Sequence, residues 1–258
     1  MSLRNLLPAL TIVTAFLLTG CGEKKQARVT PPPPPPIASP AQAPSAAPTT
    51  SPSQPVRHED ENRQDHDALF FPADAKPLFS ETGLASWYGA PYHNRRGSNG
   101  ELYNMNAMTA AHRTLPLGSV VRVTNIKTGH SCIVRITDRG PFVEGRILDL
   151  SYAAAQKIDV WQPGVAQVRL DVLQTPVPIG QGGKWAVQIG GFGEADAAHD
   201  LADHLSHRYH TAKILCFSSP VGEWWVRVRV LDDDRERANE VARETQTPEG
   251  AIFLVRLD

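Results

Sequence analysis

The chain has 258 residues, of which 41% are hydrophobic and 21% are charged, and its formal net charge is −1. This composition is typical of globular proteins and leaves room for one or two domains. Residues 82–176 carry 10 Lys and Arg against 6 Asp and Glu, and residues 184–258 carry 9 against 13. Neither excess forms the basic stripe expected of a nucleic-acid-binding protein, so nucleic acid is excluded as a partner.

The N-terminus is predicted to be a lipoprotein leader over residues 1–20. It has one early arginine, then an apolar stretch over residues 6–18 that is too short to span a bilayer comfortably. The ending Leu-Thr-Gly-Cys resembles the bacterial lipobox, which implies cleavage before Cys21 and lipid attachment to that residue. Glycine at position 22, where aspartate would retain a lipoprotein in the inner membrane, implies anchoring to the outer membrane. The alternative is an ordinary secretory signal with an incidental cysteine.

Residues 21–81 are predicted to form a disordered tether. Eleven prolines lie between Pro31 and Pro55, and a polar, charged stretch follows them. Such a composition cannot bury a hydrophobic core. An extended proline-rich chain rises about 3.1 Å per residue, so the tether reaches at most roughly 180 Å.

Strand patterns cluster in the next segment, residues 82–175, and predict a β domain. Alternation of apolar and polar residues predicts strands, and small or helix-forming residues predict two short helices, the second with Ser151 as its N-cap. The predicted strands cover residues 83–89, 119–126, 130–138 and 165–173, and the helices cover 106–112 and 151–158. A linker rich in glycine and proline follows over residues 176–183.

Residues 184–258 read strand, helix, strand, strand, helix, strand, which predicts a ferredoxin-like βαββαβ domain. Four histidines on or just after its first helix are expected to be solvated surface, because they complete no recognised ligand spacing. We therefore predict no metal and no cofactor. Cys132 and Cys216 fall in strand-like runs of different domains, and both are expected to be buried hydrophobes, with an interdomain bridge as the alternative.

Asp138 stands where a predicted strand runs into a glycine-proline turn. The alternation in "CIVRITD" predicts a half-buried strand that ends at this aspartate. A strand end holds a carboxylate on a rigid element and leaves its tip open, as binding and catalytic groups require. The alternative is a carboxylate that caps its own turn or pairs with Arg139.

Three stretches resemble the rare lipoprotein A family of septal lytic transglycosylases: "GLASWYG", "NGELYNMNAMTAAHRTLPLGSVVRVTN" and "RITDRGPFVEGRILDLSYAAAQKI". The resemblance covers about residues 82–173 and implies a six-stranded double-psi β-barrel. "WAVQIGGF" and "WWVRVRV" in the C-terminal domain resemble the SPOR domain, which binds glycan strands stripped of peptides. The expected fold is therefore mainly β plus α+β. One departure is Gly97, which stands where the family pattern has threonine.

The resemblance implies an enzyme that cleaves peptidoglycan at the division septum, with the acidic pair at Glu101 and Asp138 and a supporting His112. Breaking a glycosidic bond requires a proton for the leaving oxygen and relief for positive charge at C1, which carboxyl groups supply. The 6-hydroxyl of N-acetylmuramic acid attacks C1 intramolecularly, so one carboxyl can serve twice. We expect Asp138 to protonate the leaving oxygen and then accept the hydroxyl proton, while Glu101 stabilises charge or positions the sugar.

Other residues are expected to bind the strand or to shape the site. Flat or polar side chains that could contact sugar in the barrel domain are Tyr88, Tyr92, Tyr103, Asn99 and Arg139. In the C-terminal domain alternation places Arg227 and Arg229 on one sheet face, with Gln188 beside them and the valines facing the helices. Trp87 suits core or cleft equally, and Asp149 is interpreted as an ion-pair partner of Arg146 or Arg139.

The expected partners are peptidoglycan strands, the membrane through Cys21, and divisome proteins. Two rival functions stay open. One is a noncatalytic glycan-binding or wall-loosening protein, and the other is a hydrolase resembling barrel-fold endoglucanases.

Overall fold

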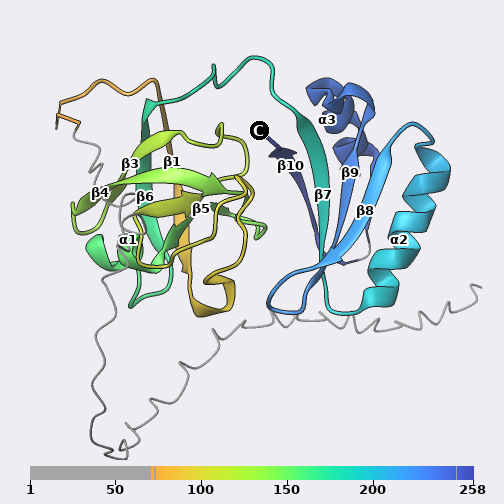
Figure 1. Ribbon diagram of the computed structural model, residues 1–258, viewed down its shortest axis with the longest axis horizontal. Coiled ribbons are helices and arrows are strands. Elements are labelled where there is room, and N and C mark those ends of the chain that lie inside the picture. Colours follow the sequence, from red (N-terminus) through yellow and green to blue (C-terminus); the bar gives the residue numbers. More distant parts are fainter. Residues whose placement is uncertain (1–70, 73, 248) are drawn as a thin grey trace, which may run out of the picture. The chain divides into compact units, whose positions relative to one another are not determined.

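The computed structural model describes residues 71–72, 74–247 and 249–258 (Figure 1). All of them fall within one compact unit, Thr50–Asp258. The predicted leader, the predicted lipidation at Cys21 and most of the predicted tether lie outside the described residues. Within the described part, no helix has the length and apolar character needed to cross a membrane.

Six strands close into a barrel in the order β1-β5-β2-β4-β3-β6, which confirms the predicted double-psi barrel (Figure 1). β1 pairs in parallel with β5, and β2 in parallel with β4, while the other neighbours run antiparallel. The first strand begins before the boundary predicted at residue 82. The elements are β1 (Phe79–Tyr88), the 3₁₀ turn η1 (Ala90–Tyr92), β2 (Thr109–Ala111), β3 (Val120–Asn125), β4 (Ser131–Asp138), β5 (Arg146–Ser151), α1 (Tyr152–Lys157) and β6 (Ala166–Gln174).

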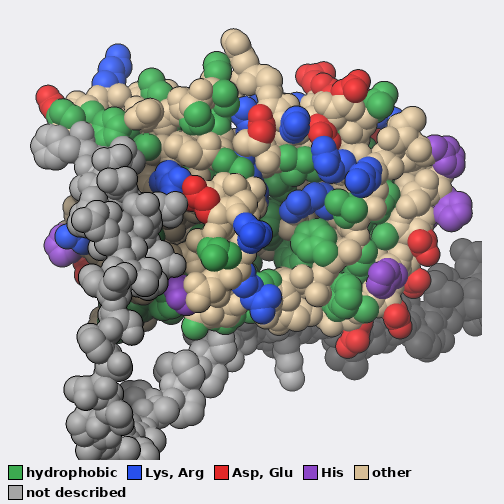
Figure 2. Space-filling view, in the orientation of Figure 1, with side chains coloured by type: hydrophobic (Ala, Val, Ile, Leu, Met, Phe, Trp, Pro, Cys, Tyr) green, Lys and Arg blue, Asp and Glu red, His purple; other side chains and the backbone are tan. Residues whose placement is uncertain are grey.

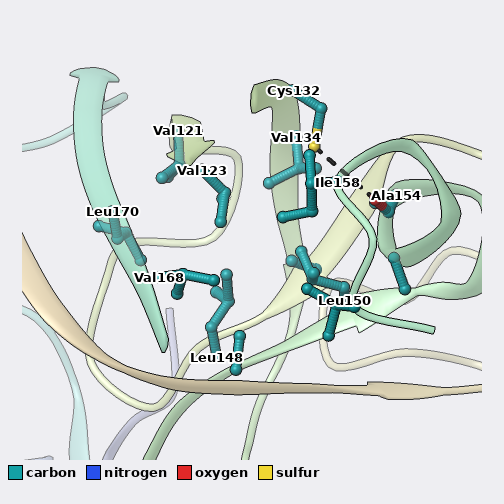
Figure 3. Packing of buried hydrophobic residues seen from close by; sticks show 14 of the residues in the cluster. Val121, Val123, Cys132, Val134, Leu148, Leu150, Ala154, Ile158, Val168 and Leu170 are labelled. Atoms are coloured by element: carbon teal, nitrogen blue, oxygen red, sulfur yellow. Dashed lines mark hydrogen bonds between the residues drawn. The ribbon is translucent and has the colours of Figure 1, made fainter. Parts of the chain in front are cut away.

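Apolar side chains that alternate along these strands fill the barrel interior (Figure 3). Val121, Leu148 and Leu170 have no exposed surface, because every second strand residue points inward. Cys132 joins this cluster as a free, buried thiol, as predicted, and burial raises its pKa to about 12. Cys216 is also free, but it is only partly buried at the edge of the C-terminal core.

The helix predicted over residues 106–112 is wrong, because Thr109–Ala111 forms strand β2 between β4 and β5. Pairing with a strand on each side overrides the helical tendency of the two alanines. Strand β5 was missing from the predicted strands, although Leu148 and Leu150 alternate within it. The helix after β5 is confirmed: Ser151 Oγ accepts a hydrogen bond of 3.2 Å from the backbone N–H of Ala154.

The C-terminal domain has the predicted βαββαβ order and forms an antiparallel sheet in the order β10-β7-β9-β8. Helices α2 and α3 pack on one face, where Val226, Val228 and Val230 are buried against them, as predicted. The four histidines of the α2 region are exposed, and Figure 2 shows histidines along α2. The elements are β7 (Trp185–Phe192), α2 (Ala195–Arg208), β8 (Lys213–Ser218), β9 (Trp224–Arg229), η2 (Leu231–Asp233), α3 (Arg235–Glu244) and β10 (Ala251–Arg256).

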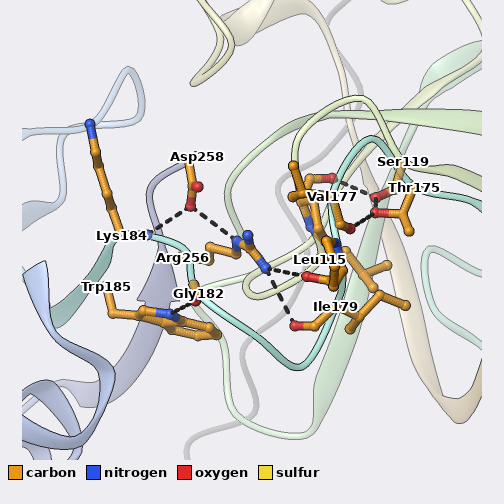
Figure 4. Close-up of polar contacts among 12 residues, drawn as sticks. Leu115, Ser119, Thr175, Val177, Ile179, Gly182, Lys184, Trp185, Arg256 and Asp258 are labelled. Carbon is orange, nitrogen blue, oxygen red and sulfur yellow. Dashed lines mark hydrogen bonds and ion pairs between the residues drawn. The ribbon is translucent and has the colours of Figure 1, made fainter.

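A buried arginine ties the linker to the last strand (Figure 4). Arg256 is 1% exposed and donates hydrogen bonds to the carbonyl oxygens of Pro178 and Ile179, both at 3.3 Å, and to Asp258 Oδ1 at 3.0 Å. The indole N–H of Trp185 donates to the Gly182 carbonyl at 2.9 Å. These contacts hold residues 176–183 against the C-terminal domain.

The barrel core should dominate the stability of the barrel domain. Replacing Leu148 by alanine removes a side chain with no exposed surface and should lower the free energy of unfolding by about 2–5 kcal/mol. Leu102 is 60% exposed, and Leu102→Ala should change the free energy of unfolding by no more than about 0.5 kcal/mol. Chemical denaturation measures both variants, and equal effects would contradict this description of the core.

Candidate functional site

Asp138 ends strand β4, and three hydrogen bonds converge on its Oδ1 atom. The backbone N–H of Ser98 donates at 2.9 Å, the Ser98 hydroxyl at 2.6 Å, and the backbone N–H of Arg139 at 2.7 Å. The turn that carries Ser98 is fixed to the same strand, since the N–H of Asn99 donates to the Thr137 carbonyl at 3.2 Å. The carboxylate is thus held firmly at the strand end. It caps its own turn as well as lining a cavity.

A cavity of about 310 Å³ lies beside Asp138. Its lining combines tyrosines, carboxyl groups and several arginines, a set that offers both flat faces and hydrogen-bond donors. Side chains of the C-terminal sheet also contribute to it. The arginines among the lining residues are Arg95, Arg96, Arg139, Arg146 and Arg227. Figure 2 shows Lys and Arg side chains gathered over the C-terminal sheet on the visible face.

The three predicted tyrosines all line this cavity. Tyr88 and Tyr103 stack with ring centroids 4.3 Å apart, and Tyr92 meets Tyr88 edge to face at 5.7 Å. Burial raises the pKa of all three phenols, so they are neutral at physiological pH. Trp87 instead packs against the barrel core and Tyr152, so of the two alternatives, core and cleft, it belongs to the core.

Glu101 lies on the same turn as Ser98 but is not among the residues that line the cavity. Its Oε1 and Oε2 accept hydrogen bonds from the two terminal nitrogens of Arg135 at 3.2 and 3.0 Å. The hydrogen bond from Arg135 is the main reason that the pKa of Glu101 is lowered. Asn99 supports the same turn, because its Oδ1 accepts from the Glu101 N–H at 3.0 Å. Of the predicted acidic pair, only Asp138 faces the cavity.

His112 is buried and its ring satisfies the backbone. Nδ1 accepts from the N–H groups of Thr114 and Leu115 at 3.1 and 3.0 Å, and Nε2 lies 3.4 Å from Glu81 Oε2. Burial lowers the pKa of His112, and the hydrogen bond from its ring lowers that of Glu81. The backbone N–H of His112 donates to the Asp138 carbonyl at 3.1 Å, so this residue supports the strand end.

Arg139 lines the cavity, but its guanidinium is engaged elsewhere. It donates to the carbonyl oxygens of His112, Leu115 and Asp258 at 3.0, 2.6 and 2.6 Å. Burial lowers its pKa to about 10, which leaves it charged at neutral pH. Its side chain fixes the wall of the cavity.

Asp149 lines the cavity too, and sequence reasoning treated it only as an ion-pair partner. The pair with Arg146 is present at 3.2 Å. Burial raises the pKa of Asp149 to about 6, against the opposing charges of Arg146 and Arg113. The sequence does indicate that Asp149 faces away from the core, because it alternates with the apolar residues Leu148 and Leu150.

Two of the three residues predicted on the C-terminal sheet face the same cavity. Arg227 donates to Gln188 Oε1 through Nε at 3.1 Å and through a terminal nitrogen at 2.6 Å, which confirms that they share a face. Gln188 is only 2% exposed. Arg229 instead pairs with Asp233. Among the described residues, no group of three or more His, Cys, Asp or Glu is placed to hold a metal ion.

Two family matches divide the chain as the structure does. Residues 80–170 match the family described as lytic transglycolase, and residues 181–249 match the SPOR domain. An endolytic peptidoglycan transglycosylase RlpA of Vibrio cholerae is 57% identical over 39% of this chain and 38% of its own length. That of Helicobacter pylori strain J99 is 44% identical over 48% of each chain.

The chain carries a lytic transglycolase domain followed by a SPOR domain, and it is similar to RlpA proteins. Its matches span less than half the length of these curated relatives. The barrel corresponds to the residues that match the lytic transglycolase family, and the residues that match the SPOR domain follow it.

Gly97 stands at the first position of this turn, where the pattern of the rare lipoprotein A family, threonine-alanine-asparagine-glycine-glutamate, has threonine. A Cβ at position 97 would lie 3.3 Å from the Thr137 carbonyl oxygen and 3.6 Å from Asp138 Cγ. A threonine would therefore bring its hydroxyl close to Asp138. In this chain Ser98 already donates a hydroxyl to that carboxylate.

Removing that hydroxyl should impair the site without unfolding the barrel. In an assay of the peptidoglycan transglycosylase activity named for the RlpA relatives, Ser98→Ala should lower the rate by roughly 10-fold, the lower end of what one hydrogen bond to a charged group contributes. Ser80 offers a matched control, since its hydroxyl donates to Asp171 Oδ1 at 2.5 Å outside the cavity lining. Ser80→Ala should leave the rate unchanged. Equal rates for Ser98→Ala and the wild type would contradict this role for the turn.

Proposed function

We propose that this protein is a lytic transglycosylase that cleaves the β-1,4 bond between N-acetylmuramic acid and N-acetylglucosamine in peptidoglycan, leaving 1,6-anhydro ends. The observation that carries the proposal is Asp138, fixed by three hydrogen bonds at the edge of a tyrosine-lined cavity. The names of the curated RlpA relatives, endolytic peptidoglycan transglycosylases, agree with it.

The reaction uses no attacking water. The 6-hydroxyl of the muramic acid closes on its own C1, and this intramolecular attack has a high effective molarity. Asp138 takes the proton of that hydroxyl, since the three hydrogen bonds hold one of its oxygens and keep the other free to accept. Glu101 acts as a positioning residue: its pair with Arg135 holds the turn that presents Ser98 to Asp138. His112 supports the same strand end through its backbone.

The substrate is proposed to be a glycan strand poor in stem peptides. Removing the peptide leaves a free lactyl carboxylate on each muramic acid, and arginine side chains bind carboxylates well. Arg95, Arg96 and Arg227 line the cavity and are suited to these groups. Sugar rings can stack on the faces of Tyr88, Tyr92 or Tyr103, while Asn99 and Arg139 hold the walls that position the strand.

The site of action is proposed to be the periplasmic face of the outer membrane at the division septum. Lipid on Cys21 would anchor the chain, and the tether would let the barrel reach the wall. The SPOR domain would direct the enzyme to peptide-poor septal glycan through Gln188, Arg227 and Arg229, with divisome proteins as further partners.

A noncatalytic glycan-binding function is the second candidate, and Gly97 favours it because the hydroxyl of the family's threonine is missing at this position. Product chemistry separates the candidates. A transglycosylase leaves anhydro ends, a hydrolase of the endoglucanase type leaves ordinary reducing ends, and a binding protein leaves no new ends.

Replacing Asp138 tests the proposed function directly. Asp138→Asn keeps the size of the side chain but removes the carboxylate, so cleavage of peptide-free strands should be lost while strand binding remains. Mass analysis of the products and co-sedimentation with glycan measure the two properties. Glu101→Gln should reduce cleavage less, because it loosens the turn only. Wild-type turnover in Asp138→Asn would refute its role.

A second prediction concerns the SPOR domain. Arg227→Gln should reduce septal enrichment of a fluorescently tagged protein to the level of its diffuse signal, because a cavity-facing donor for glycan is lost. Arg237 on α3 is the matched control, since it is exposed on the helical side and pairs with Glu240. Arg237→Gln should remain septal. Unchanged enrichment of Arg227→Gln would contradict the proposed glycan-binding face.

A further inference from the structure

Asp149 and Asp138 flank the same residue in the barrel. Strand β2 lies between β4 and β5, and the register pairs Ala111 with Asp138 on one side and with Asp149 on the other. Neighbouring strands lie about 4.8 Å apart, so the main chains at the two aspartates are separated by roughly 10 Å. Ala111 also lines the cavity, and its small side chain leaves the space between the two carboxyl groups open.

The two oxygens of Asp149 have different surroundings. Oδ2 accepts a hydrogen bond of 3.2 Å from Arg146, whereas Oδ1 is shielded from solvent and has no hydrogen-bond partner among the described residues. A shielded oxygen without a donor disfavours negative charge, which agrees with the raised pKa of about 6. A proton on Oδ1 would leave the bond from Arg146 to Oδ2 intact.

Glu101 has the opposite character. Its side chain is 49% exposed, and both of its oxygens accept hydrogen bonds from Arg135. These contacts stabilise the ionised form, and the pKa is lowered accordingly. A carboxylate in this state cannot deliver a proton near neutral pH, and Glu101 is not part of the cavity lining.

We propose that Asp149 is the proton donor to the glycosidic oxygen, paired across Ala111 with Asp138 as the proton acceptor. This rests on the proposed transglycosylase function and divides between two carboxyl groups the steps that the sequence analysis gave to Asp138 alone. Donor and acceptor carboxyls of glycosidases flank one linkage at separations of about 5–9.5 Å, which the register around Ala111 allows.

The proton and bond changes balance without any further reactant. Asp149 turns about its Cβ–Cγ bond, a torsion with a broad minimum, and gives its proton to the leaving O4 of N-acetylglucosamine as the C1–O4 bond breaks. The O6 atom of the muramic acid forms the new bond to C1, and its proton passes to Asp138. Exchange with solvent then returns a proton to Asp149 and removes one from Asp138.

The experiment compares Asp149→Asn with the wild type and with Asp171→Asn. Asp171 is a matched control because it is a buried barrel carboxylate, 8% exposed, that is paired with Arg169 at 2.9 Å and lies outside the cavity lining. Two substrates are used: peptide-free glycan strands, whose leaving sugar needs a proton, and a nitrophenyl glycoside of N-acetylglucosaminyl-N-acetylmuramic acid, whose leaving group does not.

Asp149→Asn should lose roughly 10²- to 10⁴-fold in kcat/KM on strands and retain activity within about 3-fold on the nitrophenyl substrate. Asp171→Asn should match the wild type on both. For the wild type, kcat/KM on strands should fall as the pH rises through about 6, since the protonated form of Asp149 is lost. This alkaline limb of the pH profile should be absent with the nitrophenyl substrate.

The wild-type pH profiles keep the test decisive even if Asp149→Asn fails to fold. An alkaline limb that is identical for both substrates would overturn the proposal, as would full activity of Asp149→Asn on strands. If Asp149→Asn lost kcat/KM equally on both substrates, Asp149 would be a positioning residue only, and the proposal would also be overturned. If the wild type itself produced no anhydro ends, the proposed function would fail instead, so the two failures are distinguishable.

Discussion

The register of the short strand β2 sets the geometry of the whole site. With only three residues, it brings the end of β4 and the middle of β5 to either side of Ala111 and so turns two aspartates toward one cavity. A slip of one residue in either pairing would rotate one carboxyl to the opposite face of the barrel wall. Such a slip is unfavourable, because it would expose Ile136, Leu148 or Leu150, which are buried apolar residues of β4 and β5. Core packing therefore fixes the distance between the two carboxyl groups.

The acidic residues of the site differ in their electrostatics although they share a chemical group. Asp138 receives three hydrogen bonds at one oxygen, Glu101 receives two from Arg135, and Asp149 has one shielded oxygen without a donor. The surroundings of Glu101 stabilise its negative charge, whereas those of Asp149 favour a bound proton. Separating two carboxyls in this way is how one site carries out acid and base chemistry at the same pH.

Much of the fold could be predicted from the sequence. Period-two alternation identified the long strands and the C-terminal βαββαβ order, and Ser151 marked the start of α1. The strand Thr109–Ala111 could not be recognised locally, since alanine favours helices and only pairing on both sides makes this segment extended. For the same reason the sequence placed Asp138 at a strand end but could not show that Asp149, and not Glu101, faces it across Ala111. The pairing of Glu101 with Arg135 also joins residues far apart in the chain.

The most direct measurement is a crystal structure of Asp138→Asn with a bound peptide-free glycan strand. The scissile linkage should lie over Ala111, with the glycosidic oxygen within hydrogen-bond distance of Asp149 and the muramic acid 6-hydroxyl beside residue 138. A strand bound instead along Glu101 and Arg135, away from Ala111, would contradict this account of the site.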